Sequence, residues 1–284
     1  MSIVVTGATG ALGRLVIDEL LAKVPADRVA AVVRDKEKAA GLAARGVELR
    51  VADYNDPASL DGVFRSGERV LLISGSEVGR RVPQHTAVVG AARAAGVAQL
   101  AYTGILGGPD ADFQLAAEHK VTEQVILDSG LAHTFLRNGW YNENYTENLA
   151  PVIEHGAVVA SAGDGRVASA ARADYAAAAA AVLVSDGHLG RAYELSGDTA
   201  WSFAEYAAEV AQASGKEIVH RDVPAAAHQE ILVGAGLPEA FAAILVDVDA
   251  AIERGLLAGT SGDLARLTGR PSTPIGVSVA AALA

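Results

Sequence analysis

The chain opens with Met1-Ser-Ile-Val-Val-Thr-Gly-Ala-Thr-Gly-Ala-Leu-Gly-Arg14, and the spacing of the glycines in this stretch decides the fold. Gly7, Gly10 and Gly13 stand three residues apart, directly after the apolar run Ile3–Thr6. One glycine permits a tight turn at a strand end, a second lets a pyrophosphate approach the backbone, and a third lets the next helix lie close to the strand. Free N–H groups at that helix start attract phosphate. The stretch therefore predicts a dinucleotide site; the alternative is a glycine-rich turn without a ligand.

Apolar runs and helical patterns alternate behind this turn, which is typical of repeated β-α-β units. The predicted strands are Ile3–Thr6, Val29–Arg34, Val47–Ala52, Val70–Ser74, Gln99–Thr103 and Thr134–Arg137. The predicted helices between them are Leu12–Lys23, Lys36–Ala44, Pro57–Phe64, Pro83–Ala95 and Gln114–Ser129. Strands that are apolar throughout fit a sheet buried on both faces. The sequence thus predicts an α/β fold with a Rossmann-type, doubly wound parallel sheet.

The pattern loosens after about residue 138 and predicts a second, smaller part. We expect a helix within 142–155, a strand at Val158–Ser161, an alanine-rich helix at Arg172–Val184 and a strand at Ala192–Ser196. Ser202 and Glu205 form a Ser-x-x-Glu capping box, and residues from Pro224 onward are mostly helical. We predict an NADP-binding domain over residues 1–138 and a smaller α/β substrate-binding domain over 139–284, with the later helix 172–187 packing on the first domain.

Composition excludes several classes of function. The chain carries 23 basic and 34 acidic residues, a net charge of −11, which argues against a nucleic-acid partner because such proteins need a basic face. Cysteine is absent and the seven histidines are scattered, so we expect neither disulfides nor a metal site. No apolar stretch reaches the roughly 18 residues of a membrane span. We expect no membrane insertion and a cytoplasmic location; the oligomeric state is left open.

The second predicted strand ends at Arg34, and this residue selects the cofactor. NAD sites usually carry an acid here, whereas a guanidinium can hold the 2′-phosphate of NADP by two parallel bonds. Arg34 therefore favours NADPH; the alternative is a solvated strand-end charge. Asp35 is better explained as a helix N-cap, and Asp53 could either meet the adenine edge or cap a turn. Ser74, Gly75 and Ser76 follow the fourth strand, so they should line the ribose side of the cofactor.

Several segments, in their order along the chain, identify a family. These segments are GATGALG at 7–13, VVRDKEKA at 32–39, LLISGSEVGRRVPQH at 71–85, LRNGWYNENY at 136–145, AGDGRVASAARADYAAAAA at 162–180 and YELSGD at 193–198. Together they resemble the NmrA-like branch of the atypical short-chain dehydrogenases, and within it the NADPH-dependent quinone reductases. The resemblance implies an NADPH-binding domain, a smaller C-terminal domain and a quinone cleft between them. It implies cofactor contacts by Gly7, Ala8, Thr9, Gly10, Ala11, Leu12, Gly13, Arg34, Ser74, Gly75, Ser76, Arg137, Asn138, Gly139, Trp140, Tyr141 and Asn142.

The candidate catalytic residues are His119, Asn138 and Tyr141. Tyr141 and its neighbour Trp140 could wall a flat ring, and Asn138 could donate to a carbonyl or carboxamide. The alternative for this segment is a packed interdomain turn. The Tyr-x-x-x-Lys pair of ordinary short-chain dehydrogenases is missing, because the residue four positions after Tyr102 is Leu106.

His119 stands where related NmrA-like reductases carry a lysine, so it could donate a proton near neutral pH. Equally, it could be a structural partner of Glu123, four residues along the same helix. We predict hydride transfer from nicotinamide to a quinone. The first alternative is a non-catalytic NADP(H)-binding sensor. The second is a reductase of an aromatic enone-like or ether substrate that uses His119 as the acid.

Overall fold

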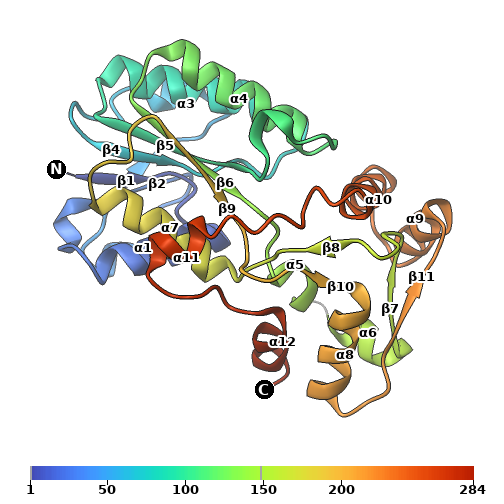
Figure 1. Ribbon diagram of the computed structural model, residues 1–284. Coiled ribbons are helices and arrows are strands. Elements are labelled where there is room, and N and C mark those ends of the chain that lie inside the picture. Colours follow the sequence, from blue (N-terminus) through green and yellow to red (C-terminus); the bar gives the residue numbers. More distant parts are fainter. Residues whose placement is uncertain (1, 148) are drawn as a thin grey trace.

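Seven parallel strands form the central sheet of the protein, whose computed structural model describes residues 2–147 and 149–284 (Figure 1). The strand order is β3-β2-β1-β4-β5-β6-β9. The bounds are Ile3–Val5 for β1, Val29–Val33 for β2, Glu48–Val51 for β3, Arg69–Leu72 for β4, Gln99–Ile105 for β5, His133–Asn138 for β6 and Arg191–Leu195 for β9. The reversal of order beside β1 makes the sheet doubly wound. The predicted fold class is therefore confirmed.

The strands are apolar throughout because both faces of the sheet are covered. Ile3 and Val5 of β1 point into one core, while Val4 points into the other. The first core lies under α1 (Ala11–Leu21), α7 (Arg172–Val184) and α11 (Asp263–Thr268). The second core lies under α3 (Arg81–Ala95) and α4 (Ala116–Ser129). Figure 1 shows these two helical layers on opposite sides of the sheet.

Two predicted helices are shorter than the sequence pattern indicated. Only Ala40–Ala44 is helical in α2, because the carboxylate of Asp35 accepts hydrogen bonds from the backbone N–H groups of Glu37 and Lys38 and holds them in a turn. The segment predicted as Pro57–Phe64 is a 3-10 helix over Pro57–Leu60. Two further 3-10 turns are Ala26–Arg28 and Gly108–Asp110.

The chain returns to the sheet after it has begun the second part. The alanines of α7 pack closely against α1, as the sequence predicted for this helix. Strand β9 extends the sheet next to β6, and α11 packs on α7 and β9. The boundary at residue 138 stays a prediction, but elements on both sides of it build the sheet and its helical layer.

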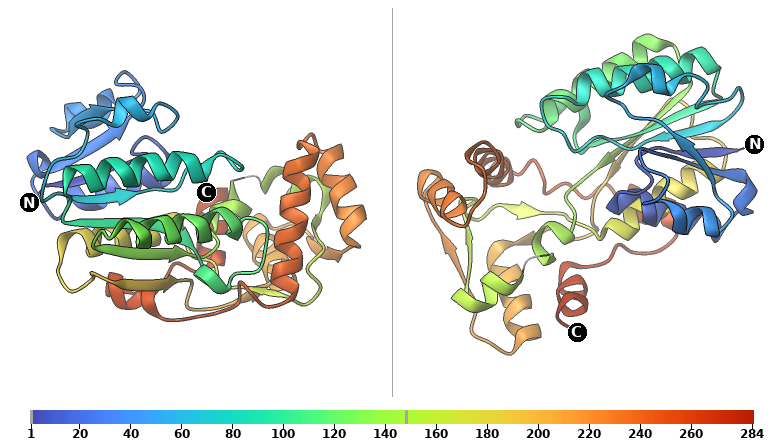
Figure 2. Two further views of the ribbon diagram at one scale, coloured as in Figure 1. Left: turned by 90° about the horizontal axis from the view of Figure 1, so that it is seen from above. Right: turned by 180° about the vertical axis from the view of Figure 1, so that it is seen from behind.

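The remaining elements form a second body around a separate apolar core. Its helices are α5 (Glu143–Thr146), α6 (Leu149–His155), α8 (Phe203–Ser214), α9 (Ala225–Gly234), α10 (Glu239–Glu253) and α12 (Ile275–Leu283). Its strands pair as β8 (Arg166–Val167) with β10 (Trp201–Ser202), and β7 (Ala157–Ala160) with β11 (Val219–Asp222). Figure 2 shows from two further sides that α9 and α10 lie at the end of the molecule away from the sheet.

Two predictions for this body can be compared with the structure. The capping box is confirmed: the N–H of Glu205 donates to Ser202 Oγ over 3.2 Å, and the N–H of Ser202 donates to Glu205 Oε2 over 2.9 Å. The helix predicted within 142–155 is found as α5 and α6, and Asn148 between them lies outside the described residues.

No helix in the described ranges combines the length and the apolar character that crossing a bilayer requires.

Candidate functional site

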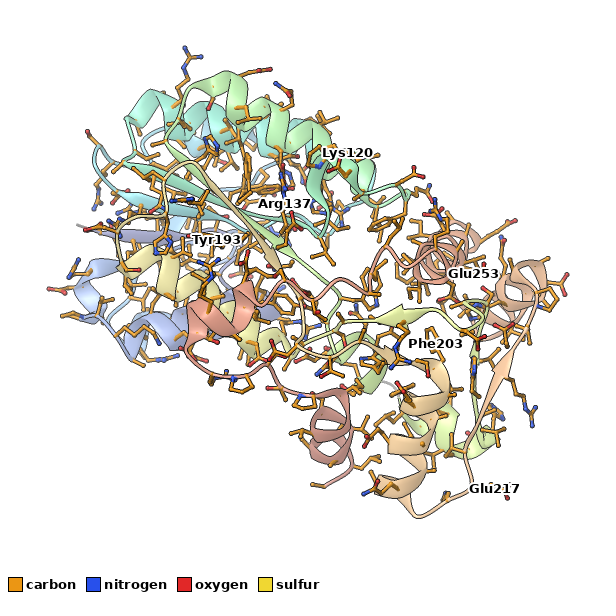
Figure 3. All side chains as sticks on the ribbon, in the orientation of Figure 1. Lys120, Arg137, Tyr193, Phe203, Glu217 and Glu253 are labelled. Carbon is orange, nitrogen blue, oxygen red and sulfur yellow. The ribbon has the colours of Figure 1, made fainter. Side chains whose placement is uncertain are left out.

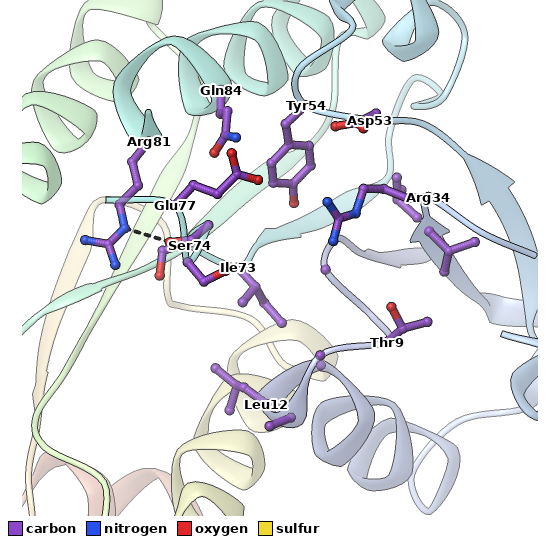
Figure 4. Close-up of a pocket in the computed structure, with 18 of the residues that line it drawn as sticks. Thr9, Leu12, Arg34, Asp53, Tyr54, Ile73, Ser74, Glu77, Arg81 and Gln84 are labelled. Atoms are coloured by element: carbon purple, nitrogen blue, oxygen red, sulfur yellow. Dashed lines mark hydrogen bonds between the residues drawn. The ribbon is translucent and has the colours of Figure 1, made fainter. Parts of the chain in front are cut away.

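A cavity of about 540 Å³ opens where β1, β2, β3 and β4 end (Figure 4). Ligands of doubly wound sheets bind at this edge, beside the point where the strand order reverses. The glycine turn, the strand ends and the start of α3 supply most of the wall, and Tyr141 and Arg172 close it from the later part of the chain. The lining residues are Gly7, Thr9, Gly10, Ala11, Leu12, Gly13, Val32, Val33, Arg34, Ala52, Asp53, Tyr54, Asn55, Ile73, Ser74, Gly75, Ser76, Glu77, Arg81, Gln84, Tyr141 and Arg172.

The glycine turn has the close approaches that the sequence predicted. Gly7 adopts a φ of +60°, a conformation that other residues rarely take. The N–H of Gly10 donates to the carbonyl of Gly7 over 3.0 Å. A Cβ on Gly13 would lie 2.3 Å from the Gly7 oxygen and 2.7 Å from Ala8 Cα. Only glycine fits at position 13, and the helix start is thereby pressed against the turn.

The start of α1 is suited to an anion. Its N-cap is Gly10, and among the described residues no side chain caps it and no acid lies in its first turn. The first N–H groups of the helix and the positive end of its dipole therefore face the cavity without a side-chain partner. The turn and the helix start together fit the pyrophosphate of a dinucleotide. Ala8 is fully buried beneath the turn and does not line the cavity.

Arg34 directly follows β2. Its side chain is exposed and lines the cavity. The Tyr54 hydroxyl lies near this guanidinium and points to the same space (Figure 4). The adjacent acid, Asp35, accepts hydrogen bonds from the backbone of its own turn; its interpretation as a helix N-cap is wrong, because α2 begins after Ala39 and no described side chain caps it. A guanidinium at this position, next to an Asp35 carboxylate that is held by its own turn, fits the 2′-phosphate of NADP.

Of the predicted segment 137–142, only Tyr141 lines the cavity. Arg137 lies between the sheet and α4 (Figure 3) and pairs with two carboxylates, those of Glu123 at 2.8 Å and Glu194 at 2.7 Å. These hydrogen bonds raise the pKa of the guanidinium. Asn142 donates to the carbonyl of Thr273 and to Ser278 Oγ. The predicted contacts of Arg137 and Asn142 with the cofactor stay predictions, and the observed partners are structural ones.

The other residues of this segment surround Tyr141 from within the protein. Asn138 donates from Nδ2 to the Tyr141 hydroxyl over 3.2 Å, and its buried Oδ1 accepts no hydrogen bond from the described residues. A Cβ on Gly139 would lie 3.0 Å from the carbonyl of Leu195. Trp140 packs against the core of the second body. The structure thus brings Asn138 and Tyr141 together, and it places Gly139 and Trp140 away from the cavity.

Arg172 lies on the cavity, at the first position of α7. Its guanidinium lies 5.2 Å from the centre of the Tyr141 ring, and its NH1 pairs with Glu147 at 2.8 Å. Its position on the cavity follows from the packing of α7 against α1. The sequence offered no local signal for it, and the same holds for Tyr54, Arg81 and Gln84.

His119 is 6% exposed and lies within hydrogen-bond distance of Tyr102, whose hydroxyl is 2.7 Å from its Nδ1. The suggested partnership with Glu123 is wrong, because Glu123 pairs with Arg137. Burial lowers the pKa of His119 to about 3, and the nearby Arg81 acts in the same direction. The imidazole is therefore neutral at pH 7, which does not favour it as a cationic proton donor. Its catalytic role stays a prediction.

In the described ranges, no three side chains of the His, Asp or Glu type come together as metal ligands would.

Acid is expected to destabilise the fold through two buried histidines. Burial lowers the pKa of His85 to about 4 and that of His119 to about 3, whereas an unfolded histidine titrates near about 6.5. As the pH falls below that value, the unfolded chain binds protons that the folded chain excludes. Each histidine should then remove about 1.4 kcal/mol of unfolding free energy per pH unit until it titrates in the fold.

Urea unfolding at pH 7 and pH 5 measures this loss. The wild type should lose about 2 kcal/mol more between the two pH values than His119→Gln loses, because the variant lacks one proton uptake on unfolding. Replacing the exposed His155 with glutamine is the control for a general effect of histidine removal. Parallel losses in wild type and His119→Gln would contradict a buried, neutral His119.

Comparison with known proteins agrees with this geometry. The model of a family described as NAD(P)H-binding matches residues 7–186. Quinone oxidoreductase 2 of Escherichia coli is 46% identical over 277 residues, which cover 98% of this chain and 97% of that protein. The crystal structure of an Escherichia coli NADPH-dependent quinone oxidoreductase with NADPH superposes with a TM-score of 0.96, at 46% identity and over 98% and 99% of the two chains.

A second solved enzyme is similar over its whole length. The triphenylmethane reductase of Citrobacter sp., complexed with NADP(H), gives a TM-score of 0.95 at 43% identity, over 99% of this chain and 100% of that one. The family model spans more than half of the chain, and the relatives span nearly all of it. The chain therefore belongs to the NAD(P)H-binding family, in its NmrA-like branch.

Proposed function

We propose that this protein is an NADPH-dependent quinone reductase. The single observation that carries the proposal is the joint presence of a glycine-built pyrophosphate cradle and Arg34 on one cavity, in a chain 46% identical to a quinone oxidoreductase over nearly its full length. The reaction is NADPH + H⁺ + quinone → NADP⁺ + hydroquinone. A sensor without turnover has less support, because two relatives that are more than 40% identical over nearly the whole chain are named as an oxidoreductase and a reductase.

Different residues of the cavity bind different parts of NADPH. The Gly7–Gly13 turn and the start of α1 hold the pyrophosphate, and Arg34 holds the 2′-phosphate. Ser74, Gly75 and Ser76 form the wall opposite, and Tyr141 with Arg172 covers the side toward the second body. When bound, NADPH supplies the hydride from C4 of its nicotinamide. The chain contributes position and exclusion of water, which together supply much of the rate of such transfers.

The lack of a Tyr-x-x-x-Lys pair fits a quinone as the acceptor. A ketone needs a proton as the hydride arrives, and this chain lacks the Tyr-x-x-x-Lys pair that would give it. His119 is neutral at pH 7 and bonded to Tyr102. Hydride addition to a quinone yields an aromatic hydroquinone anion, which water can protonate. These observations favour a quinone over the enone-like or ether substrates that would require His119 as an acid.

Oxidation of NADPH in the presence of a panel of acceptors tests the proposal. Benzoquinones and naphthoquinones should be reduced, with one hydroquinone formed per NADPH consumed, and NADH should be a poorer donor. Simple ketones of similar size should give no turnover. Tight binding of NADPH without oxidation by any quinone would contradict the proposal and favour the sensor. A cytoplasmic location, where NADPH would be supplied, stays a prediction.

A further inference from the structure

Three successive backbone N–H groups beyond β4 are bonded to side chains rather than to a neighbouring strand. The N–H of Ile73 donates to Thr6 Oγ1 over 3.1 Å, and that of Ser74 donates to Thr103 Oγ1 over 2.9 Å. The N–H of Gly75 donates to Nε2 of His85 over 2.9 Å. Regular pairing of β4 ends at Leu72, so these side chains fix the path of the segment that forms one wall of the cavity.

Gly75 is held on both sides of its Cα. Besides the bond from its N–H to His85, its carbonyl accepts a hydrogen bond from Nε of Arg81 over 2.6 Å. A Cβ on Gly75 would lie 2.8 Å from Oε1 of Gln84. The two flanking peptide planes thus have defined orientations, and α3 supplies every one of these contacts.

His85 is fully buried and its tautomer follows from its partners. Since Nε2 accepts from Gly75, the ring proton is on Nδ1, which lies 2.9 Å from Thr122 Oγ1. Thr122 in turn donates to the carbonyl of Glu118 over 2.8 Å. Burial lowers the pKa of His85 to about 4, so it remains an acceptor at neutral pH. The wall of the cavity is connected through His85 to the backbone of α4.

Glu118 of α4 holds the far end of the same loop. Its Oε2 accepts from the N–H of Gly79 over 2.9 Å, and its Oε1 accepts from the N–H of Arg81 over 3.0 Å. Both helices therefore fix the loop that carries Ser74, Gly75 and Ser76. Side chains of α3 bind its Gly75 end, and Glu118 of α4 binds its Gly79 end.

We propose that His85 is a positioning residue for hydride transfer: by accepting the Gly75 N–H, it sets the Ser74–Ser76 wall on the ribose side of the cofactor, and through the ribose the position of the reduced ring. The proposal rests on the proposed function, in that a hydride transfer must exist for its geometry to matter. His85 does not line the cavity and acts only through Gly75. Its loss should therefore affect the rate of transfer more than the binding of the dinucleotide, most of whose contacts lie elsewhere.

Two conservative variants separate the two ring nitrogens of His85. The side chain of His85→Gln can place an oxygen near the position of Nε2 and keep the acceptor for Gly75. The side chain of His85→Asn reaches only the position of Nδ1, so it keeps a partner for Thr122 and loses Gly75. We expect His85→Asn to slow transfer from bound NADPH to 1,4-benzoquinone by about tenfold or more, as misplacement of reacting groups does. Its Kd for NADPH should change by less than about threefold, and His85→Gln should keep most of the wild-type rate.

Hydrogen exchange at the Gly75 amide, measured without cofactor, provides a readout that does not depend on turnover. Exchange should be protected in the wild type and in His85→Gln, and faster in His85→Asn. Should His85→Asn fail to fold, Thr122→Val, which removes the partner of His85 Nδ1 and lies off the cavity, should speed exchange at Gly75 and slow the transfer. Equal exchange or equal rates in the Gln and Asn variants would overturn the proposal. If the wild type oxidises no NADPH with any quinone, the proposed function fails, while the exchange result still decides whether His85 holds the wall.

Discussion

Replacing Arg34 with alanine should weaken the binding of NADPH by about 10- to 150-fold and leave the binding of NADH within about threefold. The guanidinium stands on the cavity at the end of β2, where the 2′-phosphate of NADPH is expected. Hydrogen bonds between charged groups contribute about 1.5–3 kcal/mol, and about 1.4 kcal/mol corresponds to a factor of ten in Kd. NADH lacks the phosphate and therefore loses little. Isothermal titration with each nucleotide gives both constants.

Two matched variants sharpen this test. Arg34→Lys keeps the charge but loses the planar pair of donors, so its affinity for NADPH should fall between those of wild type and Arg34→Ala. Lys36→Ala removes a cation two residues away that does not line the cavity, and it should bind NADPH as the wild type does. An equal loss of NADPH and NADH affinity in Arg34→Ala would contradict the assignment of the 2′-phosphate to this side chain.

Replacing Gly13 with alanine should abolish measurable NADPH binding, with a loss of about 100-fold or more. The added Cβ would lie 2.3 Å from the carbonyl oxygen of Gly7 and 2.7 Å from Ala8 Cα, and backbone cannot yield as a flexible side chain would. Either α1 moves away from the turn or the turn opens, and both displace the N–H groups that hold the pyrophosphate. Overpacking of this kind also costs about 1–3 kcal/mol of unfolding free energy.

Gly90→Ala is the control for this substitution. Gly90 lies within α3, and a Cβ there would meet nothing within 4 Å. The variant should bind NADPH normally and gain about 0.5–1 kcal/mol of unfolding free energy, since alanine favours helix over glycine. Thermal unfolding with and without NADPH measures both effects. Normal binding and normal stability in Gly13→Ala would show that the turn is not pressed against the helix as described.

The fold was predictable because its signals are local or periodic. The three glycines, the strands apolar on both faces and the alanine-rich run all follow from residues near one another in sequence. The predicted bounds Arg172–Val184 match α7. The helix predicted within 142–155 is found as two helices, α5 and α6.

The lining residues of the cavity were predictable only where they directly follow a strand of the sheet. The turn, Arg34 and Ser74–Ser76 follow directly from strand ends, and all but Ala8 line the cavity. The segment 137–142 also follows a strand, yet Arg137 turns to Glu123 and Glu194, which lie on α4 and β9. Whether Arg137 faces the cavity or these carboxylates depends on how α4 and β9 pack beside β6. Arg172 lines the cavity and His85 contacts its Gly75 wall because α7 and α3 pack on the sheet. Sequence spacing does not encode that packing.

A single-turnover reaction tests the central claim, that this cavity holds NADPH for transfer of its hydride to a quinone. The protein, loaded with one NADPH per chain under anaerobic conditions, is mixed with excess 1,4-benzoquinone in a stopped-flow spectrometer. The nicotinamide absorbance should disappear in one phase, faster than in the same mixture without protein, with an amplitude of one NADPH per chain and an equal yield of hydroquinone. NADPH that stays bound and reduced in the presence of the quinone would contradict the account.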